Sequence, residues 1–131
     1  MTEKKILVVD DEEAIRDMLH QVFTKAGYVV RLAENAETAI EILRHESIMV
    51  MFLDLKFPGM NGVDLCNKIR LDNQIGIIYA LTGFVDLFGL VECRTAGFDD
   101  IFIKPVSAEL ILEATKEAFN KIIRWKISDL I

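Results

Sequence analysis

The hydrophobic positions of the chain form five short runs, separated by longer stretches in which they recur with helical spacing. The runs occupy residues 5–10, 28–33, 48–54, 75–81 and 101–103. The first run has no polar alternation, which is typical of a strand covered on both faces. The third run is the most hydrophobic and is expected at the centre of a sheet, whereas Arg31 in the second indicates an edge strand.

The stretches between the runs carry the spacing of amphipathic helices. After the first run, apolar residues from Ile15 to Ala26 recur every three or four positions and stop at Gly27, a residue type that favours a helix end. A later helix is expected over 86–96. Three residues that can cap the start of a helix, and one more terminating glycine, mark the other boundaries: Asn35, Asn61, Ser107 and Gly97.

Five strands that alternate with five helices predict an α/β fold. Parallel strands need helical crossovers, and these crossovers cover both faces of the sheet. We therefore expect a doubly wound five-stranded parallel sheet. In such sheets ligands bind beyond the carboxyl ends of the strands.

The composition is that of one globular domain. Of the 131 residues, 52% are hydrophobic and 27% are charged, a balance that argues against disorder. We expect a domain over residues 1–125, with residues 126–131 as a C-terminal tail or the start of a linker. The apolar runs are too short to cross a membrane, and acids interrupt the N-terminal run, unlike in a signal peptide, so a cytoplasmic location is expected.

The net charge and the cysteines narrow the functional classes. At a net charge of −6, nonspecific binding of duplex nucleic acid by this domain alone is not expected. Cys66 and Cys93 are far apart in the sequence and belong to no CxxC motif or His/Cys cluster. Two reduced, packed cysteines are therefore favoured over a disulfide or a zinc site.

Side chains that can do chemistry end four of the five predicted strands. Asp10 and Asp11 follow the first run, Asp54 ends the third, Thr82 follows the fourth and Lys104 follows the fifth. Because the carboxyl ends of parallel strands share one edge of the sheet, these side chains are expected to lie together. Taken singly, each has a structural alternative, such as an acid at a helix start or a hydroxyl in a turn. Taken jointly, they indicate a functional site.

The negative charge of crowded carboxylates must be compensated, because these groups repel one another unless a proton or a cation is present. Oxygen ligands without histidine or cysteine suit a hard cation, above all Mg²⁺. A bound dication would keep Asp54 ionised, as an oxygen nucleophile toward phosphorus. Lys104 and Thr82 could then bind phosphoryl oxygens.

Five segments carry these residues: "VVDDEE" (8–13), "FLDLKFPGMNG" (52–62), "ALTG" (80–83), "AGFDDIFIKP" (96–105) and the helix start at Ser107. With these segments and their spacing, the chain resembles the receiver domain of two-component response regulators over nearly its whole length. The resemblance implies a flavodoxin-like (βα)5 fold with strand order 2-1-3-4-5. The resemblance implies a signalling module that accepts a phosphoryl group from a sensor histidine kinase, a phosphotransfer protein or a small phosphodonor. It also implies a domain that catalyses only its own phosphorylation and dephosphorylation.

The resemblance implies a metal site around the phosphoacceptor. Asp54 would be the phosphoacceptor and one of the ligands of Mg²⁺. Asp11 would bind the metal directly and Asp10 largely through water, with the backbone carbonyl of Lys56 as a further ligand.

The resemblance also implies a switch. Thr82 would be the switch hydroxyl and Lys104 the phosphoryl-binding lysine, with a cis peptide bond between Lys104 and Pro105. The family usually has Tyr or Phe three residues before this lysine, where the chain has Ile101. Phe102 is aromatic, but strand alternation directs it to the other face of the sheet. Coupling through an aromatic rotamer is therefore not supported at this position.

The helix predicted over 86–96 and the loop before it are more apolar than one core-facing stripe requires. If Leu90, Cys93 and Ala96 face the core, several other apolar residues stay outside: Phe84, Leu87, Phe88 and Val91. Exposed apolar clusters often mark interaction sites. We hypothesise that the fourth helix, the fifth strand and the fifth helix bind a partner or a second copy of the chain; an apolar helix that is simply packed is the alternative.

Two other functions fit part of the site. A phosphatase of the haloacid-dehalogenase kind needs a second acid two residues after its nucleophile, where the chain has Lys56, and carries the nucleophile on the first strand. A flavodoxin-like cofactor binder needs a Gly-rich or Ser/Thr-rich loop after the first strand, and no such loop follows it here. The phosphoacceptor module is therefore the leading interpretation, and the phosphatase-like hydrolase is the alternative.

Overall fold

The computed structural model describes residues 3–56, 59–84 and 86–129. At its centre lies one five-stranded parallel sheet with the order β2-β1-β3-β4-β5, as predicted. The strands are β1 (Lys5–Val9), β2 (Val29–Ala33), β3 (Val50–Asp54), β4 (Ile77–Thr82) and β5 (Asp100–Ile103). The third run thus forms the central strand, and the run with Arg31 forms an edge strand.

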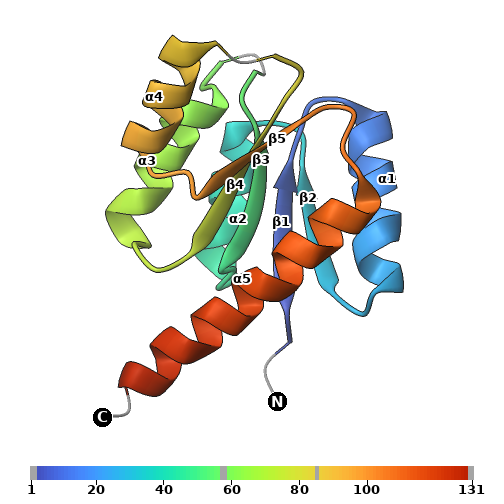
Figure 1. Cartoon of the computed structure of the whole chain (residues 1–131), viewed down its shortest axis with the longest axis vertical. Coiled ribbons are helices and arrows are strands. Elements are labelled where there is room, and N and C mark those ends of the chain that lie inside the picture. Colours follow the sequence, from blue (N-terminus) through green and yellow to red (C-terminus); the bar gives the residue numbers. More distant parts are fainter. Residues whose placement is uncertain (1–2, 57–58, 85, 130–131) are drawn as a thin grey trace.

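Five helices connect the strands and cover both faces of the sheet (Figure 1). They are α1 (Glu13–Lys25), α2 (Ala36–His45), α3 (Gly62–Asp72), α4 (Leu87–Ala96) and α5 (Ala108–Asp129). The buried residues of α1 and α5 pack on one face, and those of α2, α3 and α4 pack on the other. This is the doubly wound α/β arrangement expected from the alternation of runs and helices.

The core consists of two hydrophobic clusters, one on each face of the sheet. Successive residues of β1 alternate between them: Leu7 and Val9 lie in the cluster beneath α2 to α4, and Ile6 and Val8 in the cluster beneath α1 and α5. A strand that is buried on both faces needs an apolar side chain at each position. The absence of polar alternation in the first run has this cause.

Local side-chain chemistry sets the ends of several helices. The side-chain oxygens of three residues each accept a hydrogen bond from the backbone N–H three positions later: Asn35, Asn61 and Ser107. The glycine after α4, Gly97, has a φ of +104°, in the left-handed region that ends many helices. These are the boundaries that the sequence predicts.

Helix α4 contacts the core only through its C-terminal half. Its buried residues are Cys93 and Ala96, whereas Leu90 is 37% exposed. The expectation that Leu90 faces the core is therefore wrong. Leu90 lies one turn before Cys93, and hydrophobic spacing cannot tell at which turn a helix leaves the surface on which it packs.

The C-terminal helix crosses the expected domain boundary. Helix α5 continues to Asp129, so the division between residues 125 and 126 falls within a helix and stays a prediction. Phe57 and Pro58, in the segment 52–62, and the last two residues of the expected tail lie outside the described residues. None of the helices, as far as the chain is described, is long and apolar enough to cross a membrane.

Candidate functional site

The carboxyl ends of the strands, at the top of Figure 1, bring the predicted site residues together. Asp10 directly follows β1, Asp54 is the last residue of β3, and Thr82 is the last residue of β4. All three are buried, with 0%, 5% and 2% of their surfaces exposed. Lys104 follows β5, and its backbone N–H donates a hydrogen bond of 2.7 Å to the carbonyl of Thr82, which fixes it beside the other strand ends.

The ammonium group of Lys104 lies among three carboxylates. Its Nζ atom is 2.8 Å from Oδ2 of Asp10, 3.1 Å from Oε1 of Glu12 and 3.6 Å from Oδ2 of Asp54. Burial lowers the pKa of Lys104, but the contacts with Asp10 and Glu12 outweigh burial and leave the pKa raised. The lysine therefore stays charged and partly compensates the acidic cluster.

Asp10 is held by backbone and side-chain contacts. Its Oδ1 atom accepts a hydrogen bond of 2.9 Å from the N–H of Glu12, and its carbonyl accepts one of 2.9 Å from the Arg16 guanidinium. Its Oδ2 atom is fully buried and has no well-directed hydrogen bond, although the Lys104 ammonium is its ion-pair partner. A buried carboxylate oxygen in this state is available to a further cation.

The Asp54 carboxylate stands where charge is disfavoured. Burial and the neighbouring Asp10 raise its pKa from 3.8 to about 6, although the N–H of Lys56 and the Lys104 ammonium act in the opposite direction. The Lys56 N–H donates to Oδ1 of Asp54 over 3.3 Å. A second cation near this carboxylate would favour the ionised, nucleophilic form.

Glycine is required where α3 begins, next to this carboxylate. A Cβ atom on Gly62 would overlap with the carbonyl oxygen of Asp54 and lie 2.9 Å from Cα of Leu55. The N–H of Gly62 also donates to the carbonyl of Leu55 over 3.2 Å. The start of α3 is thus packed directly against the backbone of Asp54 and Leu55, a close approach that the sequence pattern did not reveal.

The Thr82 hydroxyl is turned toward the loop before α4. It donates a hydrogen bond of 2.8 Å to the carbonyl of Phe84 and accepts one of 3.3 Å from the N–H of Phe84. Any movement of this hydroxyl toward Asp54 would break both bonds and free the backbone of Phe84.

The donor set suits a hard cation. Asp10, Asp11 and Glu12 each offer a carboxylate oxygen, and these oxygens lie within 4.8 Å of one another. Oxygen-only ligands, and the buried Oδ2 of Asp10 without a directed hydrogen bond, fit Mg²⁺. Glu12 belongs to this cluster and pairs with Lys104, although only Asp10 and Asp11 of this group were expected at the metal.

The end of β5 differs in chemistry on its two faces. Ile101 is partly buried in the cluster beneath α2 to α4. Phe102 points to the opposite face, as strand alternation predicts, where its ring lies 5.4 Å from Tyr79 and 6.2 Å from Phe52. The peptide bond between Lys104 and Pro105 is cis.

Comparison with known families agrees with this arrangement. The family model described as the response regulator receiver domain matches residues 6–116. The chain belongs to this family. It is therefore a receiver domain of the kind that operates in two-component response regulators, and the phosphatase-like alternative is not favoured.

Named relatives of this receiver domain differ in architecture. It is 34% identical over 118 residues to sporulation initiation phosphotransferase F of Bacillus subtilis, and the match covers 89% of the chain and 94% of that protein. It is 33% identical over 118 residues to a cyclic di-GMP phosphodiesterase of Thermotoga maritima, covering 89% of the chain but only 32% of that protein. Several other curated relatives are transcriptional regulators of which the chain spans half or less.

Solved structures show the same fold. A CheY-like receiver domain protein from Methanospirillum hungatei superposes with a TM-score of 0.90 at 30% identity, over 94% of this receiver domain and 98% of that chain. The sheet order and the five flanking helices are thus those of the CheY-like, flavodoxin-like fold.

Proposed function

We propose that this receiver domain accepts a phosphoryl group on the carboxylate of Asp54. The observation that carries the proposal is the setting of this carboxylate: one oxygen is held by the Lys56 N–H, and the other faces the Lys104 ammonium. Asp10 lies close enough to help raise its pKa. Such a carboxylate is positioned rather than solvated, which favours attack on phosphorus once its charge is compensated.

The metal site would be built from the neighbouring acids. Asp10, Asp11 and Asp54, with the backbone carbonyl of Lys56, are proposed to hold Mg²⁺, directly or through water. When bound, Mg²⁺ supplies positive charge that keeps the carboxylates ionised and neutralises phosphoryl oxygens.

The proposed reaction transfers one phosphoryl group. The P–N bond of a phosphohistidine breaks while a P–O bond to an Asp54 carboxylate oxygen forms, and the imidazole leaves with the electron pair and takes up a proton. Lys104 then pairs with one phosphoryl oxygen, and the Thr82 hydroxyl donates to another. This movement would release the Phe84 backbone, because the Thr82 hydroxyl holds it in the present state.

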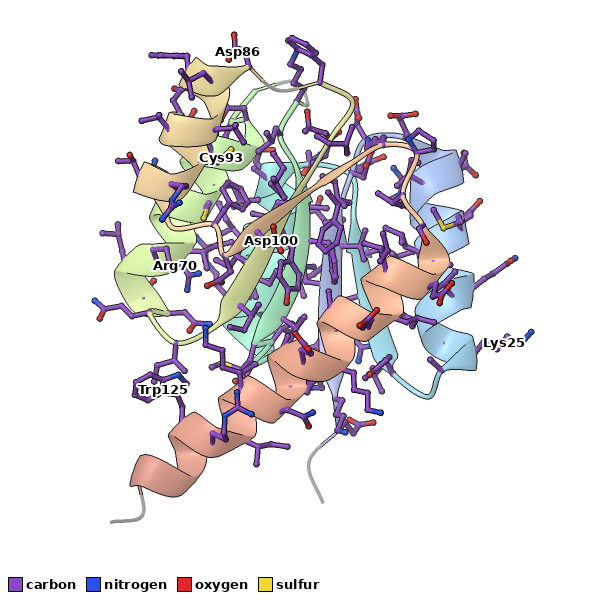
Figure 2. The ribbon with its side chains drawn as sticks, viewed as in Figure 1. Lys25, Arg70, Asp86, Cys93, Asp100 and Trp125 are labelled. Carbon is purple, nitrogen blue, oxygen red and sulfur yellow. The ribbon has the colours of Figure 1, made fainter. Side chains whose placement is uncertain are left out.

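We propose a signalling role without turnover of any other substrate, in the cytoplasm and without nucleic-acid binding by this domain alone. The phosphodonors would be a sensor histidine kinase, a phosphotransfer protein or a small phosphodonor. The partner surface would lie on α4, β5 and α5. Its part on α4 and the preceding loop is supported by the predicted outward residues, which are each more than half exposed: Phe84, Leu87, Phe88 and Val91. In Figure 2, Asp86 marks the N-terminal end of α4 at the top of the view, while Cys93 points toward the sheet.

The test is incubation with acetyl phosphate and Mg²⁺, followed by intact mass measurement. We expect the mass of one added phosphoryl group on the wild type, loss of that mass with hydroxylamine, and no addition to Asp54→Asn. Asp72→Asn, at an exposed position at the end of α3, serves as the matched control and should be modified like the wild type. An adduct that survives in Asp54→Asn would refute the assignment, as would a wild type that takes no phosphoryl group.

A further inference from the structure

The Lys104 ammonium is not closest to the residue proposed to carry the phosphoryl group. It lies 2.8 Å from Asp10 and 3.1 Å from Glu12, but 3.6 Å from Asp54. Of these contacts, the one with Glu12 is a well-directed hydrogen bond, between residues that stand 92 positions apart in the sequence. The resting lysine is thus drawn toward the end of β1 and away from the acceptor.

Glu12 reaches the lysine because it is not used to cap a helix. It occupies the N-cap position of α1 with an extended backbone (φ −84°, ψ 116°), and its side chain makes no capping hydrogen bond. Shorter residues, such as Asp, Ser or Asn, cap helices well at this position. The longer Glu side chain instead extends toward β5, with 60% of its surface exposed.

We propose that Glu12 is a positioning residue that holds Lys104 in a resting place away from Asp54 and so opposes the phosphoryl-bound state. The inference rests on the proposed function, since it assigns Lys104 to the phosphoryl group. To bind a phosphoryl oxygen, the ammonium must give up its hydrogen bond to Glu12. The free energy of that hydrogen bond therefore reduces the favourable free energy with which the domain binds a phosphoryl group.

The first test measures the binding of beryllofluoride, a phosphoryl mimic, by ¹⁹F NMR at a Mg²⁺ concentration that saturates each variant. Glu12→Gln should bind beryllofluoride at least threefold more tightly than the wild type. Glu13→Gln removes the same charge one residue later and should bind like the wild type. In a Lys104→Met background, Glu12→Gln should have no effect, because the lysine on which it acts is gone.

Two outcomes overturn the inference alone: an unchanged or weaker affinity of Glu12→Gln, or an equal gain in the Lys104→Met background, which would mean a general charge effect. A wild type that neither binds beryllofluoride nor takes a phosphoryl group overturns the proposed function and the inference with it.

The second test needs neither metal nor phosphoryl mimic. The ¹H–¹⁵N signal of the Lys104 ammonium at low temperature should shift in Glu12→Gln and broaden through faster exchange with water, but stay in place in Glu13→Gln. An identical ammonium signal in Glu12→Gln and the wild type would show that Glu12 does not hold the lysine and would overturn the inference, whatever the affinities.

Discussion

At the scale of single residues, Asp54 is a carboxylate whose surroundings disfavour its charge. Burial and the nearby Asp10 raise its pKa to about 6, and the Lys104 ammonium offsets them only in part. The group is thus more easily protonated in the folded chain than in the unfolded chain. Its ionisation therefore destabilises the fold, and a cation bound beside the carboxylate would reduce this destabilisation.

The Asp54→Asn variant should therefore be more stable than the wild type at neutral pH. Between pH 3.8 and about 6 the folded wild type binds more protons than the unfolded chain, so its free energy of unfolding falls as pH rises. Without Mg²⁺, we expect the free energy of unfolding of the variant to exceed that of the wild type by about 1–2 kcal/mol at pH 7.5. This is less than the full pKa shift implies, because the site relaxes around the charge. At pH 4 the two free energies should differ little. Urea unfolding at both pH values measures the difference.

The matched control for this comparison is Asp17→Asn, at an exposed position in the middle of α1. It should show no comparable gain that depends on pH. An Asp54→Asn variant that is equally stabilised at both pH values would contradict the linkage to ionisation.

At the scale of elements, α3 and α4 connect the two ends of the sheet. The start of α3 packs against the backbone of Asp54, and its last turns carry Arg70, labelled in Figure 2, which binds the backbone just before β4 and β5 begin. α4 begins beside the site and ends at Gly97, whose carbonyl accepts hydrogen bonds from Arg70. These helices connect the site to a distant set of hydrogen bonds around Arg70, here called the Arg70 clamp.

The Arg70 clamp should contribute to stability without contributing to phosphorylation. Its guanidinium donates to the carbonyls of Gly76 and Gly97, each at 2.6 Å, and to Asp99 at 2.9 Å, with 17% of the side chain exposed. Arg70→Met leaves these acceptors without their donor, so we expect a loss of about 2–3 kcal/mol. Phosphorylation by acetyl phosphate at 20 °C should change less than twofold.

Chemical denaturation and the mass assay measure these two effects. Arg70→Lys should recover less than half of the loss, because an ammonium cannot replace the planar fork of donors. Lys68→Met changes an exposed position on the same helix and should lower the free energy of unfolding by less than about 0.5 kcal/mol, as surface substitutions usually do. A loss as large in Lys68→Met would assign the effect to the helix rather than to the clamp.

The exposed apolar residues of α4 lead to a prediction about the association of two copies of the chain. Phe88 is 72% exposed, and its apolar neighbours on α4 are also exposed. If the proposed partner surface joins two copies, beryllofluoride with Mg²⁺ should raise the apparent mass in size-exclusion chromatography, and Phe88→Ala should reduce the increase. Leu71→Ala, at an apolar side chain on α3 that is 80% exposed, should not. A monomer under both conditions would refute the dimer and leave a different partner as the occupant.

The sequence allowed the strands and the helix caps to be predicted, because each depends on local spacing. The sheet order followed from the resemblance to receiver domains. Strand ends differ from the predicted runs by one or two residues, as at β3, which begins at Val50 rather than residue 48. The expectation that Leu90 faces the core was wrong, because hydrophobic spacing does not show how far a helix extends beyond the surface on which it packs. The Glu12–Lys104 contact was missed because it depends on side-chain reach between distant segments.

At the scale of the whole molecule, the acidic cluster concentrates part of the net charge of −6 at one edge of the sheet. A dication that binds only the folded chain relieves this repulsion and stabilises the fold by mass action. At a Mg²⁺ concentration ten times the dissociation constant, the gain is about 1.4 kcal/mol, which corresponds to roughly 3–6 °C in Tm. Differential scanning calorimetry measures the shift.

NaCl at matched ionic strength is the control for this metal effect and should give a smaller increase. Asp11→Asn should lose most of the response to Mg²⁺. Equal responses to the two salts would mean general screening rather than a specific site.

The site joins residues that follow β1 and β5, the first and last strands in chain order, to the ends of β3 and β4, which lie between them in the sheet. During synthesis the aspartates emerge early, whereas the compensating lysine follows β5 and arrives with the final third of the chain. A truncated copy that ends before β5 would contain the Asp54 carboxylate and its repelling neighbours, but not the Lys104 ammonium whose charge partly offsets theirs.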